Sequence, residues 1–323
     1  MTNLIEIKNL FVEYKTESAL KEHKNVFAVN GLSLEIKQGE ILSIAGESGC
    51  GKSTLAKAIL RLVDVKSGEI MVMDGLTENV LHLNKKELKK FRQKAQIIFQ
   101  NPYSSLNPKM KIYDILKEPL IVNKELESFK SLKKQEIDKI ILDTIKQVGL
   151  DESVLSLYPH EFSGGQRQRI AIARALVLKP QFIVADEPVS ALDVSIQAQI
   201  INLLNELKEK FNLTFLFISH DLNVIKYLSD RVGIMYLGEI VEIGTSDEIF
   251  DTPKHPYTQA LLSANPGNKQ DKIILKGDLP SPSDLPSGCK FHTRCPYAME
   301  ICKTVEPKVT KFSETHCAYC HLY

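Results

Sequence analysis

The sequence predicts an α/β fold with a parallel-sheet core, and two observations support this prediction. Residues 40–61 read as a short apolar strand, a glycine-rich turn and a segment with helical spacing. Further along, apolar runs at 182–185 and 213–218 flank an amphipathic segment at 195–210. This is the spacing of a βαβ unit, whose two strands lie parallel in one sheet.

The other elements follow in chain order. Residues 4–45 alternate apolar and polar side chains in short runs and predict an antiparallel β layer, interrupted by a polar loop at 15–25. Residues 94–100 resemble another strand, and the segment 112–180 is helical in pattern. Within it, one apolar stripe repeats at three- and four-residue intervals: Ile137, Ile140, Ile141, Ile145 and Val148.

The character of the chain changes after about residue 252, where prolines become frequent and periodicity fades. We therefore place a domain boundary near residue 255. Residues 1–254 are expected to form a nucleotide-binding domain with a helical subdomain at about 101–180, and residues 255–323 a cysteine-containing tail. No internal repeat is visible, so we expect one nucleotide cassette per chain.

Composition and charge limit the classes of protein to which the chain can belong. The chain has 323 residues, 43% hydrophobic and 25% charged, which is typical of a soluble globular protein. Its 41 basic and 40 acidic residues leave a net charge of +1, so no global field recruits nucleic acid. The first residues do not form an export signal, and no apolar stretch approaches the roughly 18 to 20 residues of a spanning helix. We expect a cytosolic protein that meets the membrane through another subunit.

The glycine-rich turn fits the phosphate-binding pattern GxxxxGK[ST]. Its glycines let backbone N–H groups approach phosphates while the following helix directs its positive end at them. Lys52 is expected to bridge phosphate oxygens and Ser53 to bind Mg²⁺ through its hydroxyl. The motif alone indicates a nucleoside triphosphate, bound by Gly46, Glu47, Ser48, Gly49, Cys50, Gly51, Lys52, Ser53 and Thr54.

Two carboxylates end the apolar run at 182–185, where a parallel sheet presents residues to a ligand. Adjacent residues point to opposite sides, so each can serve a separate role. Asp186 is placed to hold Mg²⁺ directly or through water, and Glu187 to polarise the attacking water.

A second glycine turn begins another helix at 164–178. Ser163 is a suitable N-cap, and Ser163, Gly164 and Gly165 expose N–H groups at the start of that helix. The chain thus carries a second anion site, far in sequence from the first.

These motifs together resemble the ATP-binding cassette (ABC) ATPases, all in the order of that family. The matching positions are Gly46 to Thr54, Gln100, Ser163 to Gln166, Asp186 and Glu187, Ser190 to Asp193, and His220. The resemblance implies a P-loop NTPase fold of ABC type, with a parallel-sheet core, an antiparallel β layer and a helical subdomain. It also implies two chains that sandwich two MgATP molecules, the Ser163 to Gln166 turn closing over the partner's nucleotide.

The resemblance also implies roles for single residues. Gln100 would bind Mg²⁺, sense the γ-phosphate and signal to the membrane subunit, Asp193 would couple the two sites, and His220 would contact the γ-phosphate. The family places an aromatic ring under the adenine, and Tyr14 is our candidate, with Phe27 as the competitor.

Three longer segments resemble more specifically the ATPases of bacterial dipeptide and oligopeptide importers: residues 99–108, 185–199 and 255–262. The resemblance implies a peripheral subunit on the cytoplasmic face of the membrane that hydrolyses ATP to drive peptide import. Its partners would be a second, different ATPase, two permease subunits and an extracytoplasmic solute-binding protein, without nucleic acid. Nickel or metal-chelate importers share this subfamily and stay an alternative, as do an exporter ATPase and a soluble ABC protein without a membrane subunit.

The tail holds five of the six cysteines within the last 35 residues. A reducing cytosol disfavours disulfides, so a metal or cluster explains this grouping better. Soft thiolates suit zinc or an iron–sulfur cluster. In the peptide-importer family such a tail is associated with a [4Fe-4S] cluster, and Cys289, Cys295, Cys302 and Cys320 match that pattern. Zinc, or small buried residues without a ligand, stay open, and Cys317 leaves the fourth ligand in question.

Overall fold

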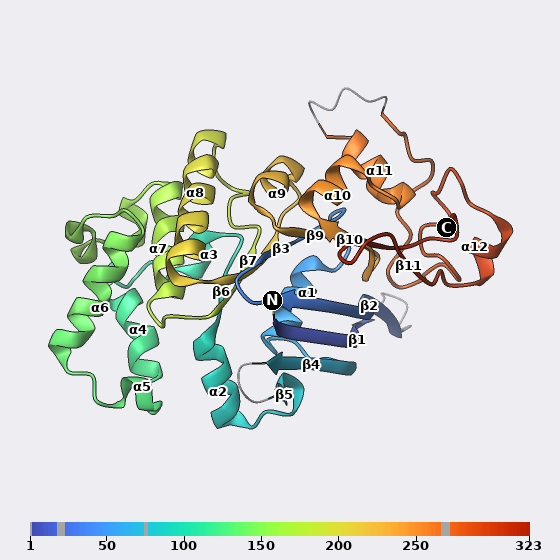
Figure 1. Cartoon of the computed structure of the whole chain (residues 1–323). Coiled ribbons are helices and arrows are strands. Elements are labelled where there is room, and N and C mark those ends of the chain that lie inside the picture. Colours follow the sequence, from blue (N-terminus) through green and yellow to red (C-terminus); the bar gives the residue numbers. More distant parts are fainter. Residues whose placement is uncertain (1, 18–22, 74–76, 266–271) are drawn as a thin grey trace. The chain divides into compact units, whose positions relative to one another are not determined.

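The computed structural model describes residues 2–17, 23–73, 77–265 and 272–323 (Figure 1). The chain forms two compact units. The first combines Met1–Leu81 with Ser219–Tyr323, and the second spans His82–Ile218. The first unit is therefore built from both ends of the chain.

The first unit contains an antiparallel sheet with the strand order β2-β1-β4-β5. Its strands are β1 (Asn3–Glu17), β2 (His23–Lys37), β4 (Ser67–Met73) and β5 (Thr77–Asn79). This confirms the predicted β layer but corrects the predicted loop at 15–25, because Lys15 pairs with Asn25 within the ladder. The loop was predicted because these residues are polar. Backbone hydrogen bonds between two strands do not require buried side chains, so a polar segment can still form a ladder. The centre of that predicted loop, 18–22, lies outside the described residues.

A second set of strands in this unit runs in the order β11-β12-β10-β9-β3. The strands are β3 (Ile41–Ala45), β9 (Arg231–Tyr236), β10 (Glu239–Thr245), β11 (Val309–Lys311) and β12 (Cys317–Tyr319). Only the β3–β9 pair among them is parallel. Two strands of the tail thus extend the sheet that carries β3. The helices of the unit are α1 (Lys52–Ile59), α9 (Leu222–Leu228), α10 (Ser246–Asp251), α11 (Pro256–Ser263) and α12 (Glu300–Thr304).

The second unit holds three parallel strands in the order β8-β7-β6. They are β6 (Ala95–Ile98), β7 (Phe182–Asp186) and β8 (Thr214–Ile218), and α8 (Val194–Phe211) connects the last two. All side chains of β7 and β8 are buried, which explains why both strands read as continuous apolar runs. The predicted βαβ unit is confirmed.

The remaining helices of the second unit lie mainly between β6 and β7 in the sequence. They are α2 (Lys85–Lys94), α3 (Pro102–Ser105), α4 (Ile112–Val122), α5 (Glu127–Lys130), α6 (Lys134–Gln147) and α7 (Gly164–Leu176). Of the predicted stripe, Ile137, Ile141 and Ile145 are buried on α6 and Val148 is buried just after it, whereas Ile140 is half-buried. Short 3-10 turns lie at η1 (Val80–His82), η2 (Glu152–Ser156) and η3 (Pro159–Glu161).

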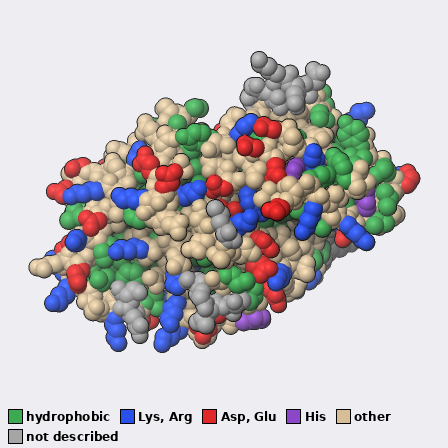
Figure 2. Space-filling view, in the orientation of Figure 1, with side chains coloured by type: hydrophobic (Ala, Val, Ile, Leu, Met, Phe, Trp, Pro, Cys, Tyr) green, Lys and Arg blue, Asp and Glu red, His purple; other side chains and the backbone are tan. Residues whose placement is uncertain are grey.

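Charged side chains of both signs share the visible surface. Figure 2 shows Lys and Arg side chains intermingled with Asp and Glu on the face in view, in keeping with the net charge of +1. Within the described ranges, none of the helices has the length and apolar character needed to cross a membrane.

Candidate functional site

The phosphate-binding motif lies between β3 and α1 in the first unit, as predicted. Two of its glycines are required by close backbone approaches. Gly46 has φ 154°, and a Cβ there would lie 2.2 Å from the Met235 carbonyl oxygen. Gly51 has φ 107°, and a Cβ there would lie 1.9 Å from the Ala28 oxygen. Any side chain at either position would force the loop out of its path.

Lys52 begins α1 and is buried inside the loop. Its Nζ donates hydrogen bonds of 2.8 Å to the Gly46 oxygen and 2.9 Å to the Glu47 oxygen. The loop thus curves around the ammonium group that the motif assigns to phosphate oxygens. The neighbouring Cys50 is buried, and burial raises the pKa of its thiol, which favours the uncharged form.

The carboxylates lie at one edge of the second unit. β6 and β7 pair in parallel, with Ile98 opposite Ala185, so the residues that follow them meet at the same edge. Gln100 Nε2 donates a 2.8 Å hydrogen bond to Glu187 Oε2. Asp186, the last residue of β7, is buried. The structure therefore brings the predicted glutamine and glutamate into direct contact, next to the predicted magnesium ligand.

The second glycine turn caps α7 as predicted. The Ser163 N–H donates to Gln166 Oε1 at 3.0 Å, and the Gln166 N–H donates to Ser163 Oγ at 3.4 Å, a reciprocal capping box. A Cβ on Gly165 would lie 2.5 Å from Ile196 Cγ2, so only glycine lets the start of α7 pack this closely on α8. Asp193 is the N-cap residue of α8. The turn and Asp193 thus belong to two helix starts that pack together.

The predicted residues divide between the two units. The Lys52 loop, Tyr14 and His220 belong to the first unit, whereas Gln100, Glu187 and the Ser163 turn belong to the second. Their joint action at one nucleotide stays a prediction. Tyr14 lies on β1 with 39% of its surface exposed, so its ring is accessible, and its role under an adenine also stays a prediction.

Two residues that contact the phosphate loop were not predicted. Arg294, in the tail, makes a bidentate ion pair with Glu47, with NH1 2.8 Å from Oε2 and NH2 3.0 Å from Oε1. The Glu47 N–H donates a 2.9 Å hydrogen bond to the Tyr257 hydroxyl. Tyr257 lies in the segment 255–262 that resembled peptide importers, but nothing local in the sequence links either residue to the loop.

Four of the tail cysteines form one group. Burial raises the pKa of Cys289 to about 11, and Cys295, Cys302 and Cys320 add to the increase because thiolate charges would repel one another. The same mutual repulsion links Cys295 with Cys302 and Cys320, and Cys320 with Cys302. Cys317 is half-buried and is the first residue of β12. Among the described residues, however, no three Cys, His, Asp or Glu side chains are arranged to hold a single metal ion.

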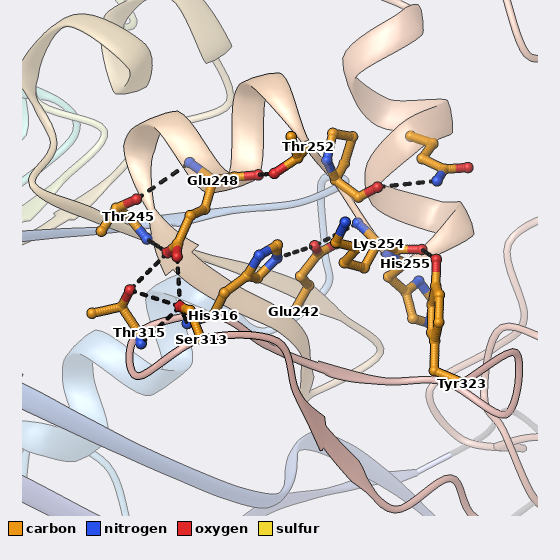
Figure 3. Close-up of polar contacts among 12 residues, drawn as sticks. Glu242, Thr245, Glu248, Thr252, Lys254, His255, Ser313, Thr315, His316 and Tyr323 are labelled. Carbon is orange, nitrogen blue, oxygen red and sulfur yellow. Dashed lines mark hydrogen bonds and ion pairs between the residues drawn. The ribbon is translucent and has the colours of Figure 1, made fainter.

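Hydrogen bonds to two carboxylates attach the end of the tail to β10 and α10 (Figure 3). The buried Glu242 carboxylate accepts from the His255 N–H at 2.9 Å and lies 2.7 Å from His316 Nε2. Burial alone would raise the pKa of Glu248, but hydrogen bonds outweigh it and lower the pKa to about 2. The donors to Glu248 are Ser313, Thr245 and Thr315.

Comparison with known proteins identifies the family. Residues 29–190 match the family model described as "ABC transporter", and residues 241–302 match "Oligopeptide/dipeptide transporter, C-terminal region". The chain is 46% identical to the oligopeptide transport ATP-binding protein AppF of Bacillus subtilis, over 99% of this chain and 97% of that protein. It is 43% identical to the di/tripeptide transport ATP-binding protein DppF of Pseudomonas aeruginosa, over 99% and 98%.

Solved structures agree with the fold. The dimeric ATP-binding cassette MJ0796 bound to ADP and Pi superimposes with a TM-score of 0.65 at 31% identity, over 75% of this chain and 98% of that one. The structure of cbiO1 from Clostridium perfringens, part of an ABC transporter complex, gives 0.66 at 27% identity, over 78% and 92%. This chain therefore belongs to the ATP-binding proteins of the ABC transporter family, in the group that carries the oligopeptide/dipeptide transporter C-terminal region.

Proposed function

We propose that this chain is the ATP-hydrolysing subunit of an importer for dipeptides and oligopeptides. The observation that carries the proposal is the match over 99% of the chain, tail included, to relatives named for peptide transport. The subunit binds and hydrolyses MgATP at the cytoplasmic face of the membrane. Permease subunits convert that cycle into transport of peptide, which an extracytoplasmic solute-binding protein delivers.

The proposed chemistry divides between the two units. Lys52 bridges phosphate oxygens from inside the loop, and His220 contacts the γ-phosphate. Glu187 orients the attacking water, since Gln100 holds its carboxylate at the edge of the sheet. Hydrolysis of this kind depends on positioning and electrostatic stabilisation rather than on a covalent intermediate.

The residues proposed to hold Mg²⁺ have the chemistry that this ion prefers. Asp186 supplies a carboxylate, Ser53 a hydroxyl and Gln100 an amide oxygen, and Mg²⁺ takes oxygen ligands. Gln100 donates to Glu187 through Nε2, so its amide oxygen is the atom left for a cation. Bound Mg²⁺ neutralises charge on the phosphate oxygens.

We further propose that two such subunits enclose the nucleotides, with Tyr14 under the adenine. The turn from Ser163 to Gln166 faces the partner's ATP, and Asp193, packed at the neighbouring helix start, couples the two sites. The dimeric state named for the cassette MJ0796 supports this arrangement. The partner is a second, different ATPase, and the pair works on two permeases.

For the tail, we propose that Cys289, Cys295, Cys302 and Cys320 bind a [4Fe-4S] cluster. Support comes from their mutual proximity and from a 2.9 Å hydrogen bond between the Cys289 N–H and the Cys302 oxygen. Zinc, with Zn–S bonds of about 2.3 Å, would need sulfurs only about 3.8 Å apart. Among the described residues no three such side chains are placed to hold a single metal ion, so the proposal rests on the four thiolates, which are the ligands that an iron–sulfur cluster takes. A bound cluster would cross-link the segments of the tail.

The decisive experiment uses the complete transport complex reconstituted in vesicles. Glu187→Gln should keep ATP binding but lower turnover and dipeptide uptake by about 100-fold or more, because the water loses its orienting carboxylate. A matched control is Glu206→Gln, an exposed glutamate on α8, which should transport normally.

Two results would contradict the proposal. Wild-type turnover in the Glu187→Gln complex would remove the role of that residue. Uptake of a nickel chelate with no uptake of peptide would assign the complex to the other cargo class.

A further inference from the structure

Glu47 places a negative charge inside a loop that binds anions. It follows Gly46 directly, and its backbone oxygen accepts a hydrogen bond from Lys52 Nζ at 2.9 Å. A free carboxylate here would repel a triphosphate, because like charges at short range cost free energy. The phosphate motif itself accepts any residue at this position. Something else must therefore compensate the charge of Glu47.

Arg294 supplies that compensation from 247 residues away in the sequence. Its planar guanidinium binds both carboxylate oxygens, at 2.8 and 3.0 Å, which is the strongest geometry for such a pair. The hydrogen bonds to Glu47 raise the pKa of Arg294 further, so the guanidinium stays charged at any physiological pH. The Arg294 side chain is 11% exposed and that of Glu47 29%, so the pair is partly buried and is screened less than a fully exposed one.

Arg294 is held in place by the packing of the tail. Its N–H donates to the Phe291 oxygen at 3.0 Å, closing a short turn. Phe291 is buried against two aromatic rings, with ring centroids 5.3 Å from Tyr236 and 5.4 Å from Tyr257. The turn that carries Arg294 is thus packed on β9 and α11.

The same aromatic cluster holds the backbone of Glu47. The Tyr257 hydroxyl accepts from the Glu47 N–H at 2.9 Å, and the Tyr257 N–H, in the first turn of α11, donates to Nδ1 of the N-cap residue His255 at 3.1 Å. Burial lowers the pKa of His255 to about 3, so this ring stays neutral and can accept. One residue of the phosphate loop is therefore fixed twice by the C-terminal part of the chain, once through its backbone and once through its side chain.

We propose that Arg294 is a positioning residue for nucleotide binding: it neutralises Glu47 and holds its carboxylate in a fixed ion pair, so that the tail contributes to the affinity of the phosphate loop. The inference rests on the proposed function, since it concerns the same nucleotide site. It gives the tail a role in ATP binding that does not depend on a metal or on the cargo.

The test measures binding of MgADP to the purified full-length chain by isothermal titration calorimetry. Arg294→Ala should weaken binding about tenfold, corresponding to about 1.4 kcal/mol, because it leaves Glu47 uncompensated beside the anion. Adding Glu47→Gln to that variant should restore binding, since the repelling charge is gone. Glu47→Gln alone leaves Arg294 as an unpaired cation beside the anion and should bind MgADP more tightly than the wild type.

Two further variants separate this effect from a general loosening of the tail. Lys290→Ala breaks a 3.1 Å ion pair with Glu306 in the same tail without touching the loop, and should bind MgADP normally. Arg294→Lys keeps the positive charge but cannot bind both carboxylate oxygens, so it should lose less MgADP affinity than Arg294→Ala. Adding Glu47→Gln to Arg294→Lys should restore that affinity. It serves in place of Arg294→Ala if thermal melting shows that the alanine variant does not fold.

The inference is overturned if Arg294 variants bind MgADP like the wild type, or if their loss persists with Glu47→Gln. An equal loss in Lys290→Ala would overturn it as well. The proposed function fails by a different result, namely a wild-type chain that binds no nucleotide.

Discussion

Glu187 shows how much of the site is decided at the scale of one residue. Its φ of 47° lies in the left-handed region, which is uncommon for a residue with a side chain. The conformation is held by a 2.9 Å hydrogen bond from its N–H to the Ile218 oxygen of β8. Such strain persists only where surrounding contacts impose it, and it gathers at functional sites. The residue type was predictable, but its backbone conformation was not.

Glu239, the first residue of β10, is a second residue whose properties depend on its surroundings in the fold. Its Oε1 accepts a 2.6 Å hydrogen bond from Asn30 Nδ2, yet burial raises its pKa from 4.5 to about 7. A raised folded-state pKa means that this group favours the folded state fully below pH 4.5, and that the benefit is lost as pH rises through about 7.

We therefore predict that Glu239→Gln stabilises the chain at pH 8, by at most about 3 kcal/mol, and much less at pH 5. The amide can still accept from Asn30 but carries no buried charge. Thermal unfolding at the two pH values measures the difference. Glu69→Gln, an exposed glutamate on β4, should change neither melting temperature. A loss of stability at pH 8 for Glu239→Gln would show that the charged form is favoured in the folded state.

At the scale of elements, the short strand β12 separates two of the tail cysteines, Cys317 and Cys320. β12 pairs antiparallel with β10, with Cys317 opposite Ile243. Cys317 is the first residue of the strand and is half-buried, whereas Cys320 directly follows the strand and is buried. Cys320 is the one of the two whose thiolate charge would repel those of Cys289 and Cys302. The spacing of the cysteines had left this choice open.

This division yields a prediction for the tail. Purified without oxygen, the wild-type chain should be brown and contain iron and sulfide, and Cys302→Ser should lose both, because a cluster needs all of its thiolates. Cys317→Ser is the matched control and should keep colour and iron. Colourless wild-type protein with stoichiometric zinc would contradict the cluster, and loss of colour in Cys317→Ser would contradict the choice of Cys320.

At the scale of the whole molecule, two helix starts carry the two predicted anion sites. α1 begins at Lys52 in the first unit and α7 at Gly164 in the second. Each exposes backbone N–H groups and the positive end of a helix. In the proposed dimer each site meets the nucleotide of a different chain, so a change at α7 should affect ATP turnover only in the assembled complex.

Ser163→Ala tests this arrangement. Loss of the cap should cost about 1 kcal/mol of stability and leave MgADP binding to the single chain unchanged, because the Lys52 loop is intact. The ATPase rate of the complete complex should fall about tenfold or more, since the partner's nucleotide loses a donor.

Thr245→Ala is the control for the cap itself. Thr245 caps α10 with the same reciprocal pattern, its Oγ1 accepting from the Glu248 N–H at 3.2 Å, but it lies outside the proposed ATP site. It should cost similar stability and leave turnover normal. An equal loss of turnover in both variants would show that Ser163 acts only through helix stability.

The sequence by itself determined the features that depend on neighbouring residues. The phosphate loop between strand and helix, the capped start of α7, the apolar stripe of α6 and the βαβ unit all follow from motifs and periodicities within a few turns of chain. These features arise from local backbone geometry and local burial, which a short pattern encodes.

Only the tertiary structure decided which distant residues meet. Gln100 reaches Glu187 across 87 residues, and Arg294 reaches Glu47 across 247. Both contacts depend on strand order and on how buried side chains pack, and a linear pattern does not contain either. The polar ends of β1 and β2 were missed for the same reason. These strands form because they pair with each other, and the residue composition of either segment alone does not predict that pairing.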